Sequence, residues 1–258
     1  MNLTALLREQ GSVAVAFSGG VDSTYLLKIA HDTLQDRAVA ITVRSSVIPA
    51  REYEKAVSFC KELGVKQVVV EADVFAVESF AQNPPDRCYH CKKYLFTEIK
   101  KAAEDLGITC VCDGTNADDT GDYRPGMKAL AELGIRSPLK EAGLTKKQIR
   151  EHSKELGLPT WNDPSMACLA SRFAYGETIT EKELRAVEEA EECLRVMGFA
   201  QYRVRVHGNL ARLEVMPEDR EKLLGKAEEV TTRLKALGFK YVTMDMTGYR
   251  TGSMNEVL

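Results

Sequence analysis

Hydrophobic and polar positions along the first half of the chain form two kinds of segment that alternate. Short apolar runs at 13–17, 38–43, 67–71 and 108–113 predict buried strands, and segments with helical periodicity at 23–34, 50–63, 89–106 and 145–156 predict helices. Such alternation is typical of a parallel sheet with helices on both faces. The pattern therefore predicts an α/β fold with a doubly wound, mostly parallel sheet, whose ligands lie beyond the carboxyl ends of the strands.

The pattern changes in the last third of the chain. We expect a helix at 180–197, strands at 201–207 and 210–215 around the hairpin signal Gly208-Asn209, a helical segment from about 218 to 237, and a strand at 239–244. This αββαβ order predicts a small α+β domain with a three-stranded sheet. Residues 158–179 are irregular, yet they carry large side chains that a plain linker would lack: Trp161, Met166, Cys168, Arg172 and Tyr175. The expected parts are a first domain at 1–157, a connecting loop at 158–179 and a second domain at 180–258.

A glycine turn, Ser18-Gly19-Gly20-Val21-Asp22-Ser23, follows the first expected strand and opens the first expected helix. Glycines let the backbone approach an anion closely, and the start of a helix presents N–H groups that suit phosphate. The hydroxyls of Ser18 and Ser23 add donors, and the Asp22 carboxylate suits a Mg²⁺ ion that bridges phosphate oxygens. A Gly-Gly turn alone is more often structural, but these six residues in a strand–turn–helix context favour a phosphate site.

The turn lacks the lysine of the G-x-x-x-x-G-K-[ST] loop, which contacts the β- and γ-phosphates of a nucleotide. It instead resembles the PP-loop of the ATP pyrophosphatase superfamily, which holds the leaving pyrophosphate while a substrate is adenylated. The resemblance implies that this chain uses ATP and releases AMP and pyrophosphate.

Two other loops follow strands at the same edge of the predicted sheet. Residues 42–46 contain Arg44 and Ser46, which are candidates for the ATP site. Residues 113–119 combine turn-forming residues with carboxylates, and we expect them to face a nucleotide or a metal ion. The alternative for this second loop is an ordinary solvated turn.

The composition is that of an ordinary soluble globular protein. Of the 258 residues, 44% are hydrophobic and 28% are charged, with a net charge of −3. Interspersed charges of both signs argue against a strong non-specific nucleic-acid binder. The N-terminal residues lack the pattern of a signal peptide, and no apolar run approaches the ~20 residues that span a bilayer. We therefore expect a cytoplasmic protein with no membrane partner.

The seven cysteines fall into two groups. Cys60, Cys110, Cys112 and Cys193 lie in apolar patterns and are expected in the core. The remaining cysteines are Cys88, Cys91 and Cys168.

Cys88 and Cys91 form a C-x-x-C motif that is compatible with zinc, redox chemistry or an iron–sulfur cluster. Structural zinc needs four ligands, and no second C-x-x-C is present. With Cys168, three thiolates suit a 4Fe–4S cluster with one open iron. Cys168 beside Arg172 equally suits a single activated nucleophile.

The strand at 201–207 separates apolar from basic side chains. Arg203, Arg205 and His207 share one face, and across the hairpin Arg212 and Glu214 join it. Cations this close repel one another when few carboxylates oppose them, so a phosphate or carboxylate site is expected here. The alternative is an ordinary solvated sheet face.

Four further motifs make the resemblance specific. They are Asn-Pro-Pro-Asp-Arg-Cys-Tyr-His-Cys-Lys-Lys at 83–93, Ser-Pro-Leu-Lys at 137–140, Leu-Gly-Leu-Pro-Thr-Trp at 156–161 and Ser-Met-Ala-Cys-Leu-Ala-Ser-Arg at 165–172. With the glycine turn and the Arg-x-Arg strand, they resemble the LarE family across essentially the whole chain. Members of this family are ATP-dependent sulfur transferases that help to build the nickel-pincer nucleotide cofactor of lactate racemase.

The resemblance implies a definite chemistry. Members adenylate a carboxylate of pyridinium-3,5-biscarboxylic acid mononucleotide, release pyrophosphate and install sulfur to give a thiocarboxylate. In some members the cysteine that matches Cys168 gives up its own sulfur and becomes dehydroalanine. In others, cysteines that match Cys88, Cys91 and Cys168 hold a 4Fe–4S cluster that carries an extra sulfide. Because this chain has all three cysteines, the cluster version is expected, in a homo-oligomer that is a hexamer in known members.

In this scheme Arg203 and Arg205, with Ser171, bind the phosphate and free carboxylate of the substrate, and Arg172 steadies developing charge. Three alternatives belong to other classes. A tRNA thiolase would need a broad basic surface or an RNA-binding domain. An amide-forming PP-loop synthetase and an ATP-binding sensor would both leave the three cysteines without a role.

Overall fold

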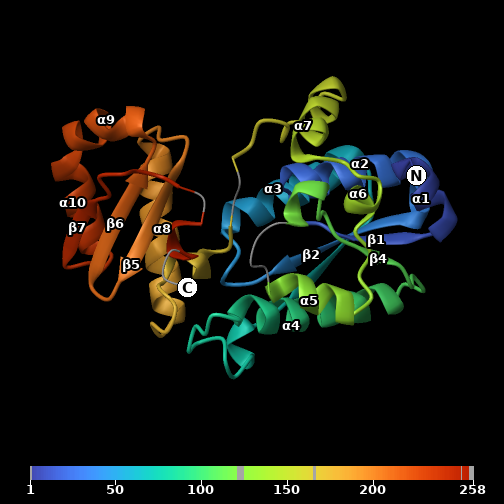
Figure 1. Ribbon diagram of the computed structural model, residues 1–258, viewed down its shortest axis with the longest axis horizontal. Helices are drawn as coiled ribbons and strands as arrows, with labels where there is room; N and C mark the ends of the chain where they lie inside the picture. The colour runs from blue at the N-terminus through green and yellow to red at the C-terminus, as the bar shows by residue number, and fades with distance from the viewer. Residues whose placement is uncertain (1, 121–124, 165–166, 251, 256–258) are drawn as a thin grey trace. The chain divides into compact units, whose positions relative to one another are not determined.

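The computed structural model describes residues 2–120, 125–164, 167–250 and 252–255 (Figure 1). The chain divides into two compact units that are not continuous in sequence. Unit 1 comprises Met1–Val77 and Asp86–Met166, and unit 2 comprises Glu78–Pro85 and Ala167–Leu258. The segment 158–179, expected as a connecting loop, is shared between the two units.

Unit 1 is built on a four-stranded parallel sheet in the order β3-β2-β1-β4. Its strands are β1 (Val13–Ala16), β2 (Ala38–Arg44), β3 (Gln67–Glu71) and β4 (Val111–Cys112). Its helices are α1 (Leu3–Gln10), α2 (Val21–Leu34), α3 (Ala50–Leu63), α4 (Arg87–Glu104), α5 (Pro125–Glu132), α6 (Pro138–Glu141) and α7 (Lys146–Glu155). Helices α4 and α5 cover one face of the sheet, and the other helices cover the opposite face (Figure 1). The predicted α/β fold with a doubly wound parallel sheet is confirmed.

Strand β1 shows why both faces need helices. Val13 and Val15 belong to an apolar cluster with side chains of α1, α2 and α3, whereas Ala14 belongs to a second cluster with side chains of α4 and α5. Successive side chains of a strand point to opposite faces, so each face receives apolar groups. A strand buried on both faces is a continuous apolar run in the sequence, and the pattern alone could therefore locate it.

Two features of unit 1 differ from the predicted pattern. Strand β4 has only two residues, whereas the apolar run extends over 108–113, because only Ala14 and Val15 of β1 pair with it. Helix α1 was not predicted. It buries leucines from one face, and the Asn2 side chain caps its first turn by accepting from the Thr4 N–H at 3.1 Å.

Unit 2 contains a three-stranded sheet in the order β5-β6-β7. Strands β5 (Tyr202–His207) and β6 (Leu210–Val215) are antiparallel, and β7 (Tyr241–Met244) runs parallel to β6. The helices are α8 (Glu181–Val196), α9 (Arg220–Gly225) and α10 (Ala227–Ala236). The predicted small α+β domain is confirmed, and the helical segment expected from about 218 to 237 consists of the two helices α9 and α10. Glycine is a weak helix former, and the helix breaks at Gly225-Lys226, where Lys226 has φ −111° and ψ 13°.

The short segment Glu78–Pro85 is part of unit 2 through buried hydrogen bonds. Asn83 is 0% exposed, and its Nδ2 donates to the Ala174 carbonyl at 2.6 Å. The Gly176 N–H donates to the Asn83 carbonyl at 2.9 Å, and the Ile179 N–H donates to the Ala81 carbonyl at 2.8 Å. Two stretches far apart in the sequence are thus joined side by side. In the described part of the chain, no helix has the length and apolar character needed to cross a membrane.

Candidate functional site

The glycine turn lies between β1 and α2, where the sequence predicts it. Gly20 is the N-cap residue of α2, and no side chain caps this helix start, so its first N–H groups have no side-chain acceptor. Gly19 has φ +75°, and a Cβ there would lie 3.3 Å from the Ala56 Cβ, so conformation and packing both favour glycine. The hydroxyls of Ser18 and Ser23 lie 3.1 Å apart. The turn therefore offers backbone and hydroxyl donors to an anion.

A lysine from a distant part of the sequence reaches this turn. Lys146 is the first residue of α7, and its Nζ donates to Asp22 Oδ2 at 2.6 Å across 124 residues of sequence. Thr145 and Gln148 form a capping box that fixes the start of α7. Within the described residues, Asp22 Oδ1 is buried and accepts no hydrogen bond. This carboxylate oxygen fits the predicted role of Asp22 toward Mg²⁺, and Lys146 adds a positive charge that suits phosphate.

The loop at 113–119 packs against the same helix start. A Cβ on Gly114 would lie 3.0 Å from the Ser23 backbone nitrogen, so any larger residue would crowd the start of α2. Asp113 is buried, and Asp118 accepts from the Lys146 backbone N–H at 2.8 Å. The loop therefore lies beside the phosphate turn and holds the helix that carries Lys146.

Arg44 and Ser46 lie at the carboxyl end of β2, the neighbour of β1 in the sheet. Arg44 is exposed, with its Nη1 3.4 Å from Glu71 Oε1 and its guanidinium 5.3 Å from the centroid of the Tyr53 ring. Ser46 is half-buried in the turn that follows. Their place at this edge is compatible with the expected ATP site.

The three cysteines outside the apolar patterns, Cys88, Cys91 and Cys168, are divided between the two units. Cys88 and Cys91 are half-buried on the first turns of α4 in unit 1, and their spacing places both on one face of the helix. Cys168 is exposed in unit 2 and directly precedes a short 3-10 turn, Leu169–Arg172. Ser165 and Met166, which belong to the motif around Cys168, lie outside the described residues. Within those residues, no three His, Cys, Asp or Glu side chains are gathered around a possible metal position.

Three of the other four cysteines are packed inside the units. Cys60, Cys112 and Cys193 are buried, as predicted, whereas Cys110 is half-buried with its Sγ 3.7 Å from that of Cys112. Burial raises the pKa of the Cys60 thiol to about 12, because a thiolate there would lose its hydration. Cys60 therefore stays protonated near neutral pH.

Arg172 is inside the protein with most of its donors committed. It is 0% exposed, and its Nε and Nη2 each donate to one oxygen of Glu191 at 2.8 Å. Its Nη1 donates to the carbonyls of Ala167 and Cys168, at 2.9 and 3.1 Å, and to Ser171 Oγ at 2.9 Å. The guanidinium of Arg172 is therefore buried against the backbone of the Cys168 loop. The sequence did not indicate the role of Glu191, because a glutamate in a highly charged helix is usually exposed to solvent.

The basic face of β5 is buried, which excludes the solvated alternative. Arg203 and Arg205 are 4% and 5% exposed. The expectation that few carboxylates oppose these cations is wrong. Glu214 is 0% exposed and accepts from Arg205 Nη2 at 3.0 Å and from Arg212 Nη2 at 3.1 Å. Glu214 lies opposite Arg203 in the β5–β6 register, and a carboxylate buried on this face needs the neighbouring cations as partners.

The electrostatic environment of Arg203 suits the binding of an anion. Burial and the positive charge of Arg172 lower the pKa of Arg203 to about 10. Its guanidinium lies 5.1 Å from the centroid of the Tyr249 ring, and its Nη1 donates to the Tyr202 carbonyl at 2.6 Å. A buried cation repelled by a second cation is stabilised when an anion binds beside it. This environment suits a phosphate or carboxylate group.

Comparisons with known proteins place the chain in a family. Residues 3–93 match the family described as NAD synthase. The pyridinium-3,5-bisthiocarboxylic acid mononucleotide synthase of Lactiplantibacillus plantarum is 40% identical over 258 residues, which cover 99% of this chain and 93% of that protein. The chain belongs to the LarE family. An uncharacterized protein of Synechocystis is 41% identical over 259 residues, which cover 100% of this chain and 97% of that protein. The argininosuccinate synthase of Haloarcula marismortui is 30% identical over 160 residues, which cover 58% of this chain and 38% of that protein.

Membership of the LarE family makes this chain an ATP-using enzyme of sulfur transfer, as the sequence predicted. The structure groups the candidate residues of this LarE-family chain by unit. Unit 1 holds the phosphate turn, Lys146, Arg44 and Ser46, and unit 2 holds the Cys168 loop beside the basic strand β5.

Glu214 gives a stability prediction for unit 2 of this LarE-family chain. We expect Glu214→Ala to lower the free energy of unfolding by about 3–5 kcal/mol, because it leaves Arg205 buried without its main partner. Chemical denaturation followed by circular dichroism measures the change. The control Glu181→Ala removes only an exposed ion pair with Arg185 and should cost less than about 1 kcal/mol. A similarly small loss for Glu214→Ala would contradict the prediction.

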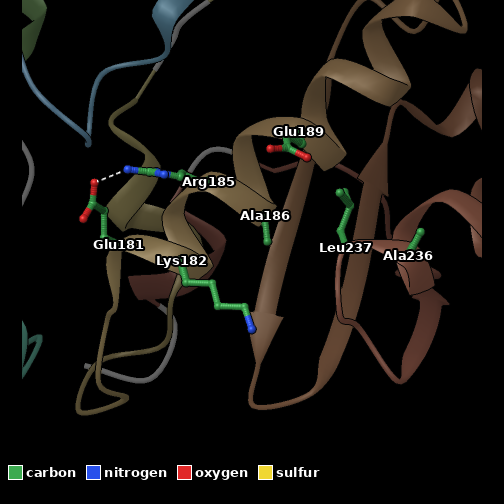
Figure 2. Close-up of a pocket in the computed structure, with 7 residues that line it drawn as sticks. All are labelled: Glu181, Lys182, Arg185, Ala186, Glu189, Ala236 and Leu237. Carbon is green, nitrogen blue, oxygen red and sulfur yellow. Dashed lines mark hydrogen bonds and ion pairs between the residues drawn. The ribbon is translucent and has the colours of Figure 1, made fainter.

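Figure 2 shows a surface pocket of unit 2 that carries none of the candidate residues. It is lined by Glu181, Lys182 and Arg185 of α8 and by Leu237 after α10. Its charged side chains are solvated, and Glu181 pairs with Arg185 at 2.5 Å. The pocket therefore lacks the buried, convergent polar groups that mark β5 and the Cys168 loop.

Proposed function

We propose that this chain adenylates a carboxylate of pyridinium-3,5-biscarboxylic acid mononucleotide and converts it to a thiocarboxylate. The observation that carries the proposal is the 40% identity, over nearly the whole chain, to a synthase named for the corresponding bisthiocarboxylic acid. The aligned region covers 99% of this chain, so it spans both units.

Adenylation belongs to the residues of unit 1. A carboxylate is a poor acyl donor, and its transfer to AMP gives a mixed anhydride with a good leaving group. We propose that the turn 18–23, with Asp22 toward Mg²⁺, and Lys146 stabilise the negative charge that develops on pyrophosphate. The uncapped start of α2 and the 2.6 Å contact of Lys146 with Asp22 support this role. Arg44 and Ser46 complete the ATP site in the proposal.

Sulfur transfer belongs to the Cys168 loop and to β5. Arg203, Arg205 and Ser171 orient the phosphate and free carboxylate of the substrate, supported by the buried positive charge of Arg203. Cys88, Cys91 and Cys168 are the proposed ligands of a 4Fe–4S cluster, for which three thiolates are a chemically fitting donor set. A cluster held by these cysteines would supply sulfide as the sulfur nucleophile. The same family resemblance supports a homo-oligomer.

The cluster has a direct test in the composition of the protein and its turnover. After anaerobic purification we expect about four iron and four sulfide per chain, and repeated turnover with ATP, substrate and a sulfide source. Cys88→Ala should lose the iron and the repeated turnover, whereas the control Cys110→Ala, at a half-buried cysteine outside the motif, should keep both.

Two other outcomes point elsewhere. A single turnover without iron, with the elements of H₂S lost from Cys168, would favour the sacrificial mechanism over the cluster. If ATP and pyridinium-3,5-biscarboxylic acid mononucleotide give neither pyrophosphate nor thiocarboxylate, the proposed function is wrong.

A further inference from the structure

A buried carboxylate lies behind the Cys168 loop. Glu191, in the middle of α8, is 5% exposed, and both of its oxygens accept hydrogen bonds. Oε1 accepts from Arg172 Nε at 2.8 Å and from the Val204 backbone N–H at 3.1 Å, and Oε2 accepts from Arg172 Nη2 at 2.8 Å. One carboxylate thus joins α8, the end of the cysteine loop and strand β5.

The second edge of the Arg172 guanidinium faces the cysteine loop. Its Nη1 donates to the carbonyls of Ala167 and Cys168 and to Ser171 Oγ. A guanidinium is a rigid, planar group, so a carboxylate that fixes one edge also fixes the direction of the donors on the other. The backbone on both sides of the Cys168 side chain is therefore held indirectly by Glu191.

The same loop is tied to the basic strand at a second point. Arg205 Nη1 donates to the Ser171 carbonyl at 3.1 Å, and the Val204 N–H binds Glu191. The first bond joins the Cys168 loop directly to β5, and the second joins β5 to the carboxylate that holds Arg172. Strand β5 carries the proposed anion-binding arginines. The loop and the strand therefore have a defined position relative to each other within unit 2.

We propose that Glu191 is a positioning residue for sulfur transfer, which acts through Arg172 to hold Cys168 at a fixed place relative to β5. The proposal rests on the proposed function, because it takes Cys168 as a residue of the sulfur site and β5 as the substrate site. A buried ion pair is no better for stability than apolar residues of similar volume, so its value here lies in geometry. A displacement of reacting groups by about 1 Å is enough to lower a rate about 100-fold.

The test compares Glu191→Gln with Glu192→Gln, the same change at the next residue of α8, whose side chain is exposed. Hydrogen exchange is measured at the Ser171 and Phe173 amides, which donate to the carbonyls of Cys168 and Ala170. We expect exchange at both amides to be about tenfold faster in Glu191→Gln, as local opening increases. We also expect kcat for sulfur transfer to fall about 100-fold, with the KM for ATP within about twofold of the native value. Glu192→Gln should match the native chain in every measurement.

Cys193 provides an internal check on folding, because it is buried on α8 two residues from Glu191. Alkylation followed by peptide mass spectrometry should leave Cys193 unmodified in Glu191→Gln. A second variant, Arg172→Met with Glu191→Met, replaces the ion pair by apolar side chains and should fold while losing the ties to the loop. It should show the same faster exchange and the same loss of kcat.

Two results would overturn the proposal. One is unchanged exchange at Ser171 and Phe173 in both variants. The other is alkylation of Cys193 in both, which would make Glu191 a residue that holds the fold and not the loop. If the native chain transfers no sulfur but Glu191→Gln still speeds exchange at Ser171, the loop is held as described and the proposed function has failed.

Discussion

The Cys168→Ser variant is expected to lose sulfur transfer by a factor of about 10⁴ or more, the scale of loss when an enzyme loses its reacting group. A serine hydroxyl carries no sulfur to donate, and its oxygen is a much poorer ligand for the iron of a cluster than a thiolate is. The loop around it should keep its shape, because its bonds to Arg172 and Ser171 use the Cys168 carbonyl and not the thiol. A loss of product therefore reports on the chemistry of the sulfur atom.

The measurement separates the two halves of the reaction. Thiocarboxylate is followed by mass spectrometry and pyrophosphate by a coupled assay. We expect pyrophosphate release to persist in Cys168→Ser, since adenylation needs no sulfur. The control Ala167→Ser adds a hydroxyl at the exposed neighbouring residue and should behave as the native chain does. Repeated production of thiocarboxylate by Cys168→Ser would contradict a role for this thiol.

The second large effect is expected at Lys146, in the adenylation half of the reaction. Lys146→Ala should lower the rate of pyrophosphate release about 100-fold, because it removes a positive charge from the place where pyrophosphate becomes negative. The adjacent Lys147 is the matched control. Its side chain is 86% exposed and lies 3.9 Å from Glu151, away from Asp22. Lys147→Ala should leave the rate within about twofold of native.

Initial rates of pyrophosphate release at saturating ATP and magnesium give the comparison. The folded structure should survive the change, since Lys146 is partly exposed and the start of α7 is capped by Thr145. Lys146→Arg keeps the charge and is expected to retain more activity than Lys146→Ala. If all three variants release pyrophosphate at the native rate, Lys146 is only the ion-pair partner of Asp22.

The sequence predicts those features that depend on neighbouring residues. The sheet of unit 1 was predictable because Val13, Ala14 and Val15 form an apolar run that serves both faces. The glycine turn was predictable because its chemistry lies within residues 18–23. The alternation of β5 likewise placed Arg203 and Arg205 on one face.

The features missed from the sequence depend on contacts between distant residues. Lys146 lies 124 residues from Asp22, and nothing near either residue indicates the contact. Buried Arg205 donates to Ser253 Oγ at 3.1 Å, and Ser253 lies 48 residues further along the chain. Glu214 was assigned to the correct face, but its neighbours alone do not reveal that the face is covered. The partition of Glu78–Pro85 into unit 2 has the same origin, because its partners come near residue 174.

That partition has a consequence for the order of events on the ribosome. The side-chain amide of Asn83 donates to the carbonyl of Ala174, which is synthesised 91 residues later. This buried hydrogen bond therefore cannot form until Ala174 has been added to the chain. At a translation rate of about 5–20 residues per second, the delay is roughly 5–18 seconds. Phe80 is 1% exposed in the finished protein. During this interval the rest of unit 2, residues 167–258, has not yet been synthesised and cannot bury it. Nascent chains should therefore expose this apolar residue to chaperones until translation passes the second segment.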